Sequence, residues 1–184
     1  MNILDLRWTK GEPEAFSEMK IRWARADHIF TDNLIPAVGV DPGRNWAIAF
    51  VDPLNSPGKF ELTSYWATMP KEEDSQDYFH KIRDFVKKWV PQPFLYKVAM
   101  VEGSSYGDRY GQQLLEQCRL GFYEAFRELG CKVSYVSPKT PRKHVLGNGN
   151  INSKNVFLDL NHNGADAAVI ALYASGYEYK ENEI

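Results

Sequence analysis

The sequence has no long hydrophobic run and no apolar segment at its amino end. A membrane-spanning helix needs about 20 consecutive apolar residues, and no run among the 184 residues approaches that length. The first nine residues also lack the apolar core of a secretory signal. We therefore expect a cytoplasmic protein with no membrane segment.

Cysteine is scarce, and neither charge predominates. The two cysteines, Cys118 and Cys131, are not spaced as a metal-binding pair and have no histidine nearby. A structural zinc site is therefore not expected, and a reducing compartment fits this composition. The formal net charge is −2 and the isoelectric point is about 6.1, which excludes a surface that is basic overall. Any binding of an anionic partner must rely on local positive charge.

One local concentration of positive charge is present. Lys139, Arg142, Lys143 and His144 fall within six residues, and Lys154 follows shortly afterwards. On charge alone, a solvated basic stretch is the simpler explanation of this cluster. A binding patch is the alternative.

The chain does contain enough apolar material for one folded domain. Hydrophobic residues make up 43% of it and charged residues 25%, which are ordinary values for a globular protein. A domain of this size buries about 70% of the surface of its unfolded chain. We predict an extension at residues 1–35, a main domain at residues 36–178 and a polar tail at residues 179–184.

The extension is predicted to be helical over residues 12–30. Pro13 stands near the first turn, where proline is well tolerated. Apolar side chains recur at steps of three and four residues, as in an amphipathic helix. They are Phe16, Met19, Trp23, Ala26, Ile29 and Phe30. We expect this helix to cover the main domain or to extend a dimer.

The main domain alternates between strand-like and helix-like patterns. Strands are predicted at residues 37–41, 46–51, 60–68, 97–101 and 131–136, with turn residues between them. Helices are predicted at residues 72–90, 108–129 and 165–174, with helix and loop from residue 138. A three-strand meander followed by alternating helix and strand predicts an α/β fold with a mixed five-stranded sheet flanked by helices.

Three acidic residues stand at the ends of predicted elements. Asp41 closes the first strand of the main domain, Glu102 closes the fourth, and Asp166 lies in the first turn of the last helix. If the first and fourth strands are neighbours, all three carboxylates can meet at one edge of the sheet. Such an oxygen cluster suits Mg²⁺ or Mn²⁺, and two ions about 4 Å apart support phosphodiester hydrolysis. The alternative is that each acid is only a cap or turn residue.

Five segments, in order, resemble the motifs of the RuvC-type Holliday-junction resolvases, which are RNase H-like nucleases. The resemblance extends over about residues 37–176. The segments are VGVDPG at 38–43, VE and a glycine-serine loop at 101–105, QQLLEQCRLG at 112–121, PKTPRKHVLGNG at 138–149 and GADAAVIAL at 164–172.

The resemblance implies an RNase H-like homodimer that makes paired nicks in four-way DNA junctions, with two Mg²⁺ or Mn²⁺ ions in each active site. It implies that Asp41 bridges the ions and that Glu102 and Asp166 each hold one. Family members carry an acid or a histidine three residues before the final aspartate, where this chain has Asn163. Either Asn163 or the preceding His162 is expected to complete the metal site.

The resemblance also suggests how DNA is held. Lys154 is expected to contact the scissile phosphate or to stabilise the charge that develops there. Lys139, Arg142 and Lys143 would neutralise the backbone of the junction arms without reading sequence. Tyr106 would stack on an unpaired base, or else pack against the helix that follows it.

The partners and the location follow from the same resemblance. A symmetric junction needs two active sites, so a homodimer is expected. The apolar stripe of the helix at residues 108–129 either supplies the dimer surface or belongs to the core. We expect association with the nucleoid, and a viral or organellar origin stays open.

Other functions compete with a junction resolvase. One is a DNA-junction-binding module of the same fold that has lost catalysis, which the uncharged Asn163 makes conceivable. Another is an RNase H-like nuclease that acts on forks, flaps or hybrids. The Asp-Pro-Gly turn also occurs in actin-like ATPases, but their duplicated fold is much longer than this chain.

Overall fold

The computed structural model describes residues 6–30, 34–54, 57–92, 94–103 and 111–179. The strands are β1 (Trp8–Lys10), β2 (Glu14–Phe16), β3 (Met19–Phe30), β4 (Ala37–Asp41), β5 (Asn45–Pro53), β6 (Lys59–Thr68), β7 (Val98–Glu102) and β8 (Lys132–Val136). The helices are α1 (Ser75–Trp89), α2 (Gln112–Glu128), α3 (Lys139–Leu146), α4 (Ser153–Val156) and α5 (His162–Ala174).

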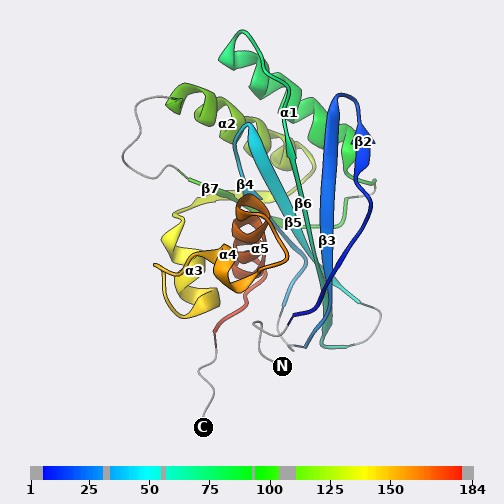
Figure 1. The fold of residues 1–184 in the computed structure, drawn as a ribbon, viewed down its shortest axis with the longest axis vertical. Coiled ribbons are helices and arrows are strands. Elements are labelled where there is room, and N and C mark those ends of the chain that lie inside the picture. The colour runs from blue at the N-terminus through cyan, green and yellow to red at the C-terminus, as the bar shows by residue number, and fades with distance from the viewer. Residues whose placement is uncertain (1–5, 31–33, 55–56, 93, 104–110, 180–184) are drawn as a thin grey trace.

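The strands form one eight-stranded sheet with helices on both faces. Its order is β1-β3-β6-β5-β4-β7-β8, and β2 pairs with β3 outside this path. Helices α1 and α2 lie on one face, whereas α3, α4 and α5 lie on the other (Figure 1). Among the described helices, none is both long enough and apolar enough to cross a membrane.

Five of the strands form the predicted mixed sheet. β4, β5 and β6 make an antiparallel meander, whereas β4, β7 and β8 run parallel to one another. β4 and β7 are direct neighbours, with Val40 opposite Val101. The predicted fold class is confirmed in these strands and in the helices that flank them.

The helix predicted for residues 12–30 is wrong, because this segment forms strands β2 and β3. The turn between them contains Ser17, whose φ of 55° reverses the chain. β3 pairs with β6 from Arg22 to Phe30, with an irregularity between Ala26 and Ile29. The sheet of the main domain therefore includes part of the segment predicted as an extension. Three strands at the amino end therefore widen the sheet beyond the predicted five.

The cause of this error is a sequence pattern that fits two structures. Met19 and Ile21 are buried on one face of β3, while Lys20 and Arg22 are exposed on the other. This alternation with a period of two overlaps with apolar residues at helical spacing. The free edge of β6 decides between them, because it offers hydrogen bonds that only an extended segment can use.

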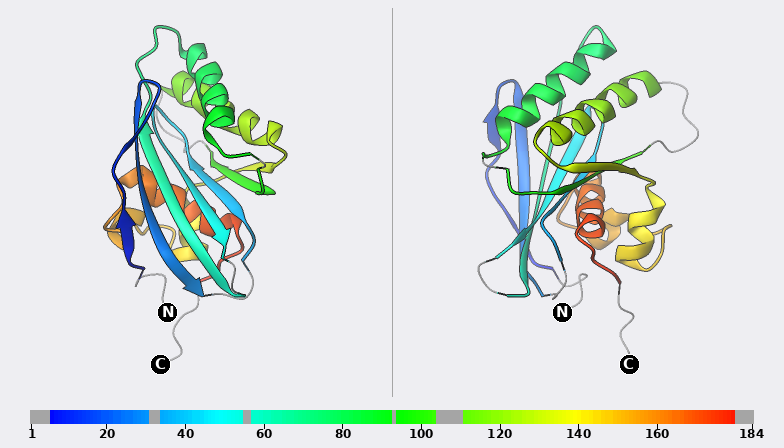
Figure 2. Two further views of the ribbon diagram at one scale, coloured as in Figure 1. Left: turned by 90° about the vertical axis from the view of Figure 1, so that its right-hand side faces the viewer. Right: turned by 180° about the vertical axis from the view of Figure 1, so that it is seen from behind.

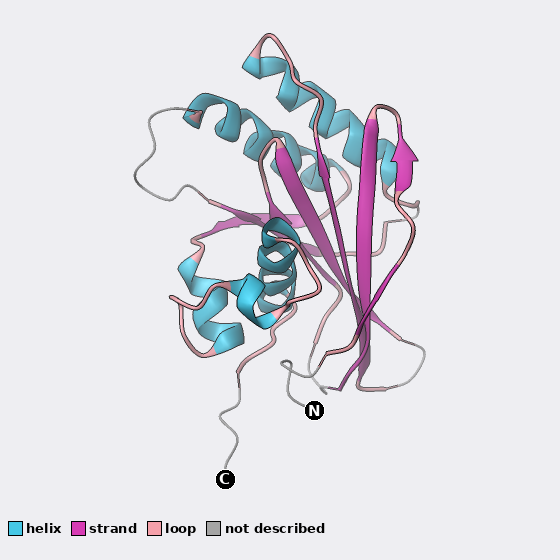
Figure 3. Ribbon diagram, viewed as in Figure 1, coloured by secondary structure: helices cyan, strands magenta, loops and turns pink. Residues whose placement is uncertain are grey.

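Each face of the sheet has its own hydrophobic core. On the side of α1 and α2, Trp46 packs against Phe85 and Phe122. On the other side the sheet packs against α5, with α4 and α3 beyond it, as the views in Figures 2 and 3 show. Helix α5 approaches the sheet closely at Gly39 of β4, where a Cβ would lie 2.2 Å from the backbone nitrogen of Ala171. A glycine at this point is therefore a packing requirement.

Helix α5 begins at His162, earlier than the predicted start at residue 165. The side chain of Asn161 caps it by accepting a hydrogen bond of 2.7 Å from the backbone nitrogen of Gly164. Asparagine is among the preferred residues for this position, and it was the overlooked signal. The earlier start places Asp166 at the beginning of the second turn.

Candidate active site

Two of the three predicted acids stand side by side at the carboxyl ends of parallel strands. Val40 is opposite Val101 in the register of β4 and β7, so the next residues along, Asp41 and Glu102, are also adjacent. Both valines point into the core beneath α1 and α2. Because side chains alternate along a strand, both carboxylates point to the opposite face, which α5 covers. The third acid, Asp166, stands on α5.

The three acids lie close enough to influence one another electrostatically. Burial raises the pKa of Asp41 well above its usual value, and the negative charges of Glu102 and Asp166 raise it further. Burial and the charge of Asp166 raise the pKa of Glu102 to about 7. Arg142 and Arg119 lower both pKa values, but less than these effects raise them. We call Asp41, Glu102 and Asp166 the acid cluster.

Asp166 is held by partners from two other helices. The guanidinium of Arg142 on α3 donates to its Oδ1 at 2.8 Å, and the hydroxyl of Ser153 on α4 donates to the same oxygen at 2.6 Å. Ser153 is completely buried, and the Arg142 and Asp166 side chains are 25% and 18% exposed. In the described part of the chain, the Asp41 and Glu102 carboxylates have no such hydrogen bond. The negative charges of Asp41 and Glu102 are therefore less compensated by neighbouring donors than the charge of Asp166.

A buried arginine lies behind the acid cluster. Arg119 on α2 donates from Nε to the backbone oxygen of Glu102 at 2.8 Å, and its guanidinium also pairs with Glu116. Its side chain is only 5% exposed. Arg119 thus fixes the end of β7 and brings a positive charge close to two carboxylates.

Neither Arg119 nor Ser153 was predicted from the sequence as a residue of the site. A signal for Arg119 was present, because it stands next to Cys118 and three residues before Phe122 on the face of α2 that is buried in the core. A charged residue on a buried helix face is uncommon and usually has a specific partner. No comparable pattern marks Ser153, because its partner Asp166 is brought to it only by the packing of α4 on α5.

The acid cluster has the donor chemistry of a hard divalent cation. All of its groups are carboxylate oxygens, the ligands that Mg²⁺ prefers. Two of these carboxylates are enclosed by protein and carry charge that burial penalises, which a cation would relieve. Among the described residues, however, no three His, Cys, Asp or Glu side chains are arranged so that they could hold a metal ion. The geometry agrees with this, since Asp166 is turned to Arg142 and Ser153.

Asn163 and His162, which were expected to complete the metal site, face another part of the molecule. The amide nitrogen of Asn163 donates to the backbone oxygen of Asn45. Both residues line a cavity together with Trp66 and Thr68 of β6, and no member of the acid cluster lines it. Their assignment as metal ligands stays a prediction.

The predicted DNA-binding residues fall into separate groups. Lys139 and Lys143 are exposed on α3, whereas Arg142 of the same helix is engaged with Asp166. Lys154 follows Ser153 in α4, and its ammonium group donates to the backbone oxygen of Leu158 at 2.5 Å. Tyr106 lies outside the described residues.

The apolar stripe of α2 belongs to the core. Cys118, Phe122 and Phe126 are fully buried between this helix, α1 and the sheet. They are therefore not available as a dimer surface. The homodimer itself stays a prediction.

The mixed sheet with helices on both faces defines an α/β protein with the RNase H-like fold in its RuvC form. The Thermus thermophilus RuvC structure is similar at 18% identity and a TM-score of 0.55, covering 75% of this chain and 92% of that one. The structure of T. thermophilus RuvC in complex with a Holliday junction substrate is similar at 16% identity and a TM-score of 0.57, covering 75% and 91%.

These likenesses are structural. No protein-family model and no curated protein matches the sequence. At such low identity the two RuvC structures establish the fold, and they confirm the RuvC-type architecture that the motifs predicted.

Proposed function

We propose that this protein is a structure-specific DNA endonuclease that resolves four-way junctions by paired, Mg²⁺-dependent phosphodiester hydrolysis. The observation that carries the proposal is the convergence of Asp41, Glu102 and Asp166 on one face of a RuvC-like sheet. Carboxylates that repel one another in a buried site are costly to a fold. A cation bound between them would offset this cost.

Asp41 and Glu102 would hold the divalent cation, and Asp166 would join them after exchanging its contact with Arg142. The bound cation would polarise the phosphodiester and favour ionisation of water. Water adds to phosphorus, the bond from phosphorus to the 3′ oxygen breaks, and that oxygen takes up a proton. The products are 5′-phosphate and 3′-hydroxyl ends.

The protein's own cations would support the same step. Arg119 holds the backbone of Glu102, so it keeps that carboxylate in place beside Asp41. Arg142 neutralises Asp166 in the present arrangement. Once Asp166 turns to the cation, the guanidinium of Arg142 would be free beside the acid cluster. Its planar donor geometry is suited to donating hydrogen bonds to a phosphate oxygen.

Branched DNA is the proposed partner, and a homodimer would place two active sites on one symmetric junction. The exposed Lys139 and Lys143 would contact the phosphate backbone of the arms, and Lys154 would approach the scissile phosphate from α4. Such contacts give affinity that falls with salt and does not depend on sequence.

A second candidate is a junction-binding module without catalysis. It is favoured by the contacts of Arg142 and Ser153 with Asp166, which leave no ready-made group of three metal ligands among the described side chains. The lack of charge on Asn163 also favours this second candidate. This candidate predicts junction affinity without Mg²⁺-dependent nicking.

The test is incubation of labelled four-way junction, replication fork, flap, RNA–DNA hybrid and linear duplex with the protein in Mg²⁺ or in EDTA. Asp41→Asn serves as the inactive variant, and exposed Asp84→Asn on α1 as its matched control. Symmetric nicks in the junction alone, lost with EDTA and with Asp41→Asn, would support the resolvase. Binding without nicking would support the second candidate, and equal cutting of linear duplex would refute both.

A further inference from the structure

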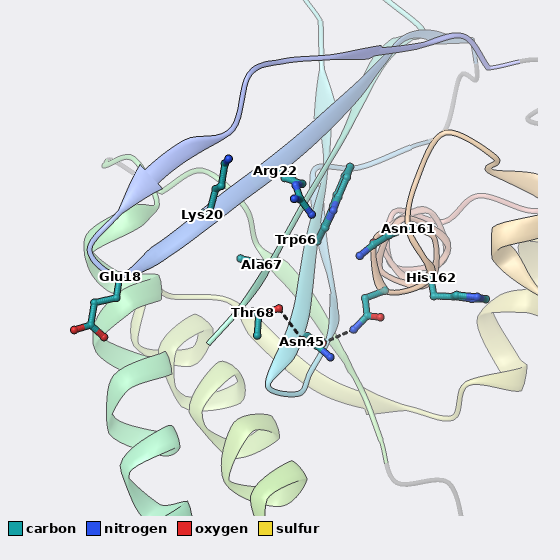
Figure 4. Close-up of a pocket in the computed structure, with 10 residues that line it drawn as sticks. Glu18, Lys20, Arg22, Asn45, Trp66, Ala67, Thr68, Asn161 and His162 are labelled. Atoms are coloured by element: carbon teal, nitrogen blue, oxygen red, sulfur yellow. Dashed lines mark hydrogen bonds between the residues drawn. The ribbon is translucent and has the colours of Figure 1, made fainter. Parts of the chain in front are cut away.

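Beside the acid cluster, on the same face of the sheet, lies a separate cavity of about 520 Å³. Its floor is made by β3, β6 and the start of β5, and one wall is the amino end of α5. Figure 4 shows Arg22 and Trp66 on neighbouring strands, with Asn161 facing Trp66 from the helix side. Strand β3, in the segment for which a helix was predicted, thus builds part of this cavity.

The cavity and the acid cluster form one row across the sheet. Arg22 of β3 is opposite Trp66 of β6, Trp66 is opposite Ala47 of β5, and Ala47 is opposite Asp41 of β4. The next strands in the sheet are β4 and β7, which end in Asp41 and Glu102. Neighbouring strands are ~4.8 Å apart, so the distance from β4 to β3 is roughly 14 Å.

All of these side chains point toward α5. Ala24 and Ala26 of β3 are buried against α5, so Lys20 and Arg22, at even steps from them, face the same side. By the same alternation, Trp66 follows Leu62 of β6 on the α5 side. A polymer lying along this face could contact both sites at once.

The cavity is lined by two positively charged side chains. Lys20 and Arg22 are exposed, and neither forms an ion pair within the described part of the chain. Glu18, the carboxylate of the lining, lies at the turn and is directed away from Trp66 in Figure 4. The two cations are therefore available to an anionic ligand.

Trp66 offers a flat apolar surface beside these cations. The ring is partly exposed and is fixed on one side by α5, since a Cβ at Gly164 would lie 3.1 Å from it. A fixed, partly exposed aromatic ring next to two cations suits a nucleotide, because the base can stack while the phosphate pairs with the cations. The amide groups of Asn45, Asn161 and Asn163 add hydrogen-bonding capacity at the wall.

We propose that this cavity binds one nucleotide of the cleaved DNA strand, a few residues from the scissile phosphate, with its base on Trp66 and its phosphate on Lys20 and Arg22. The proposal rests on the proposed function, which it deepens by adding a second contact to the same strand. A stacked base must be out of its duplex, so the cavity would favour DNA that is unpaired near the branch point.

The test places 2-aminopurine at successive positions from the nick site in a four-way junction and uses the Asp41→Asn background to prevent cutting. Stacking on Trp66 should quench the fluorescence at one position a few nucleotides away. Trp66→Phe should keep most of this quenching, whereas Trp66→Ala should abolish it and weaken binding about tenfold.

The predicted contact of the phosphate with Lys20 and Arg22 is tested by the double variant Lys20→Ala and Arg22→Ala. Loss of two phosphate contacts should reduce the slope of log K against log salt concentration by about 1.4. The matched control replaces two exposed cations that do not line the cavity, Lys88 on α1 and Lys132 at the start of β8, by alanine. It should leave the slope unchanged. Since Lys20 and Arg22 are exposed, this variant should melt at the temperature of the parent protein.

The outcomes separate the two proposals. If the wild-type protein nicks junctions but the cavity variants match their controls in affinity, salt slope and fluorescence, the nucleotide site is rejected and the proposed function stands. If the wild-type protein neither binds nor cuts any of the DNAs, both proposals fail. Quenching that survives Trp66→Ala in a folded protein would also overturn the site.

Discussion

Removing the charge of Glu102 should stabilise the metal-free protein at neutral and alkaline pH. In the folded state its pKa is raised from the usual 4.5 to about 7. Below pH 4.5 the side chain is protonated whether the chain is folded or not, so its ionisation has no effect on stability. As the pH rises from 4.5 to 7, ionisation increasingly favours the unfolded chain, and above pH 7 the penalty is complete.

The size of the effect follows from the shift. At 1.36 kcal/mol for each pH unit, a pKa difference of this size corresponds to about 3 kcal/mol. Glu102→Gln should therefore raise the free energy of unfolding by about 1–3 kcal/mol at pH 8, because the amide recovers only part of the penalty. For a chain of this length this is a rise in Tm of roughly 2–10 °C.

The assay is thermal unfolding in EDTA between pH 4 and pH 8, with Glu73→Gln in an exposed loop as the matched control. The advantage of Glu102→Gln should be absent near pH 4 and should grow as the pH rises. Excess Mg²⁺ should then stabilise the wild-type protein more than the variant, because binding to the folded state adds to its stability. A variant no more stable than wild type at pH 8, or an advantage that does not depend on pH, would refute the reasoning.

Three further predictions concern packing and the partner of Asp166. Gly39→Ala should cost about 3 kcal/mol or more, because its Cβ would lie 2.2 Å from the Ala171 backbone; an unchanged Tm would contradict this contact. Phe122→Ala should cost about 3–5 kcal/mol in urea unfolding, as for other large buried aromatics, and a cost below 1 kcal/mol would place Phe122 outside the core. Arg142→Gln should lower Tm in EDTA and enlarge the rise that Mg²⁺ causes, since Asp166 loses its cation; a smaller Mg²⁺ response would show that Arg142 helps the ion to bind.

The positions of the acid cluster were predictable because they depend on local patterns and one topological rule. The apolar run before Asp41 and the one before Glu102 each define a short buried strand and its end. The parallel pairing of β4 and β7 then brings the two ends together. Asp166 was located by the alanine-rich helix that carries it.

The contacts around the acid cluster were not predictable in the same way. The pairing of Arg142 with Asp166 depends on how α3 packs against α5, and no spacing along the chain encodes it. Arg142 was therefore predicted to contact DNA, because it lies in a basic segment. The helix prediction for residues 12–30 failed for a related reason. The apolar pattern of this segment fits both a helix and a strand, and hydrogen bonds with β6, which is distant in sequence, favour the strand.

The three acids are mounted on β4, β7 and α5, whose interior residues include some of the least accessible in the molecule. β4 and α5 meet in the close contact at Gly39, and β7 is held by its buried side chains in the core beneath α1 and α2. The backbone positions of the three acids should therefore persist for as long as the domain stays folded, and only their side chains are free to rearrange. On heating, loss of the site and collapse of the whole structure should be a single event.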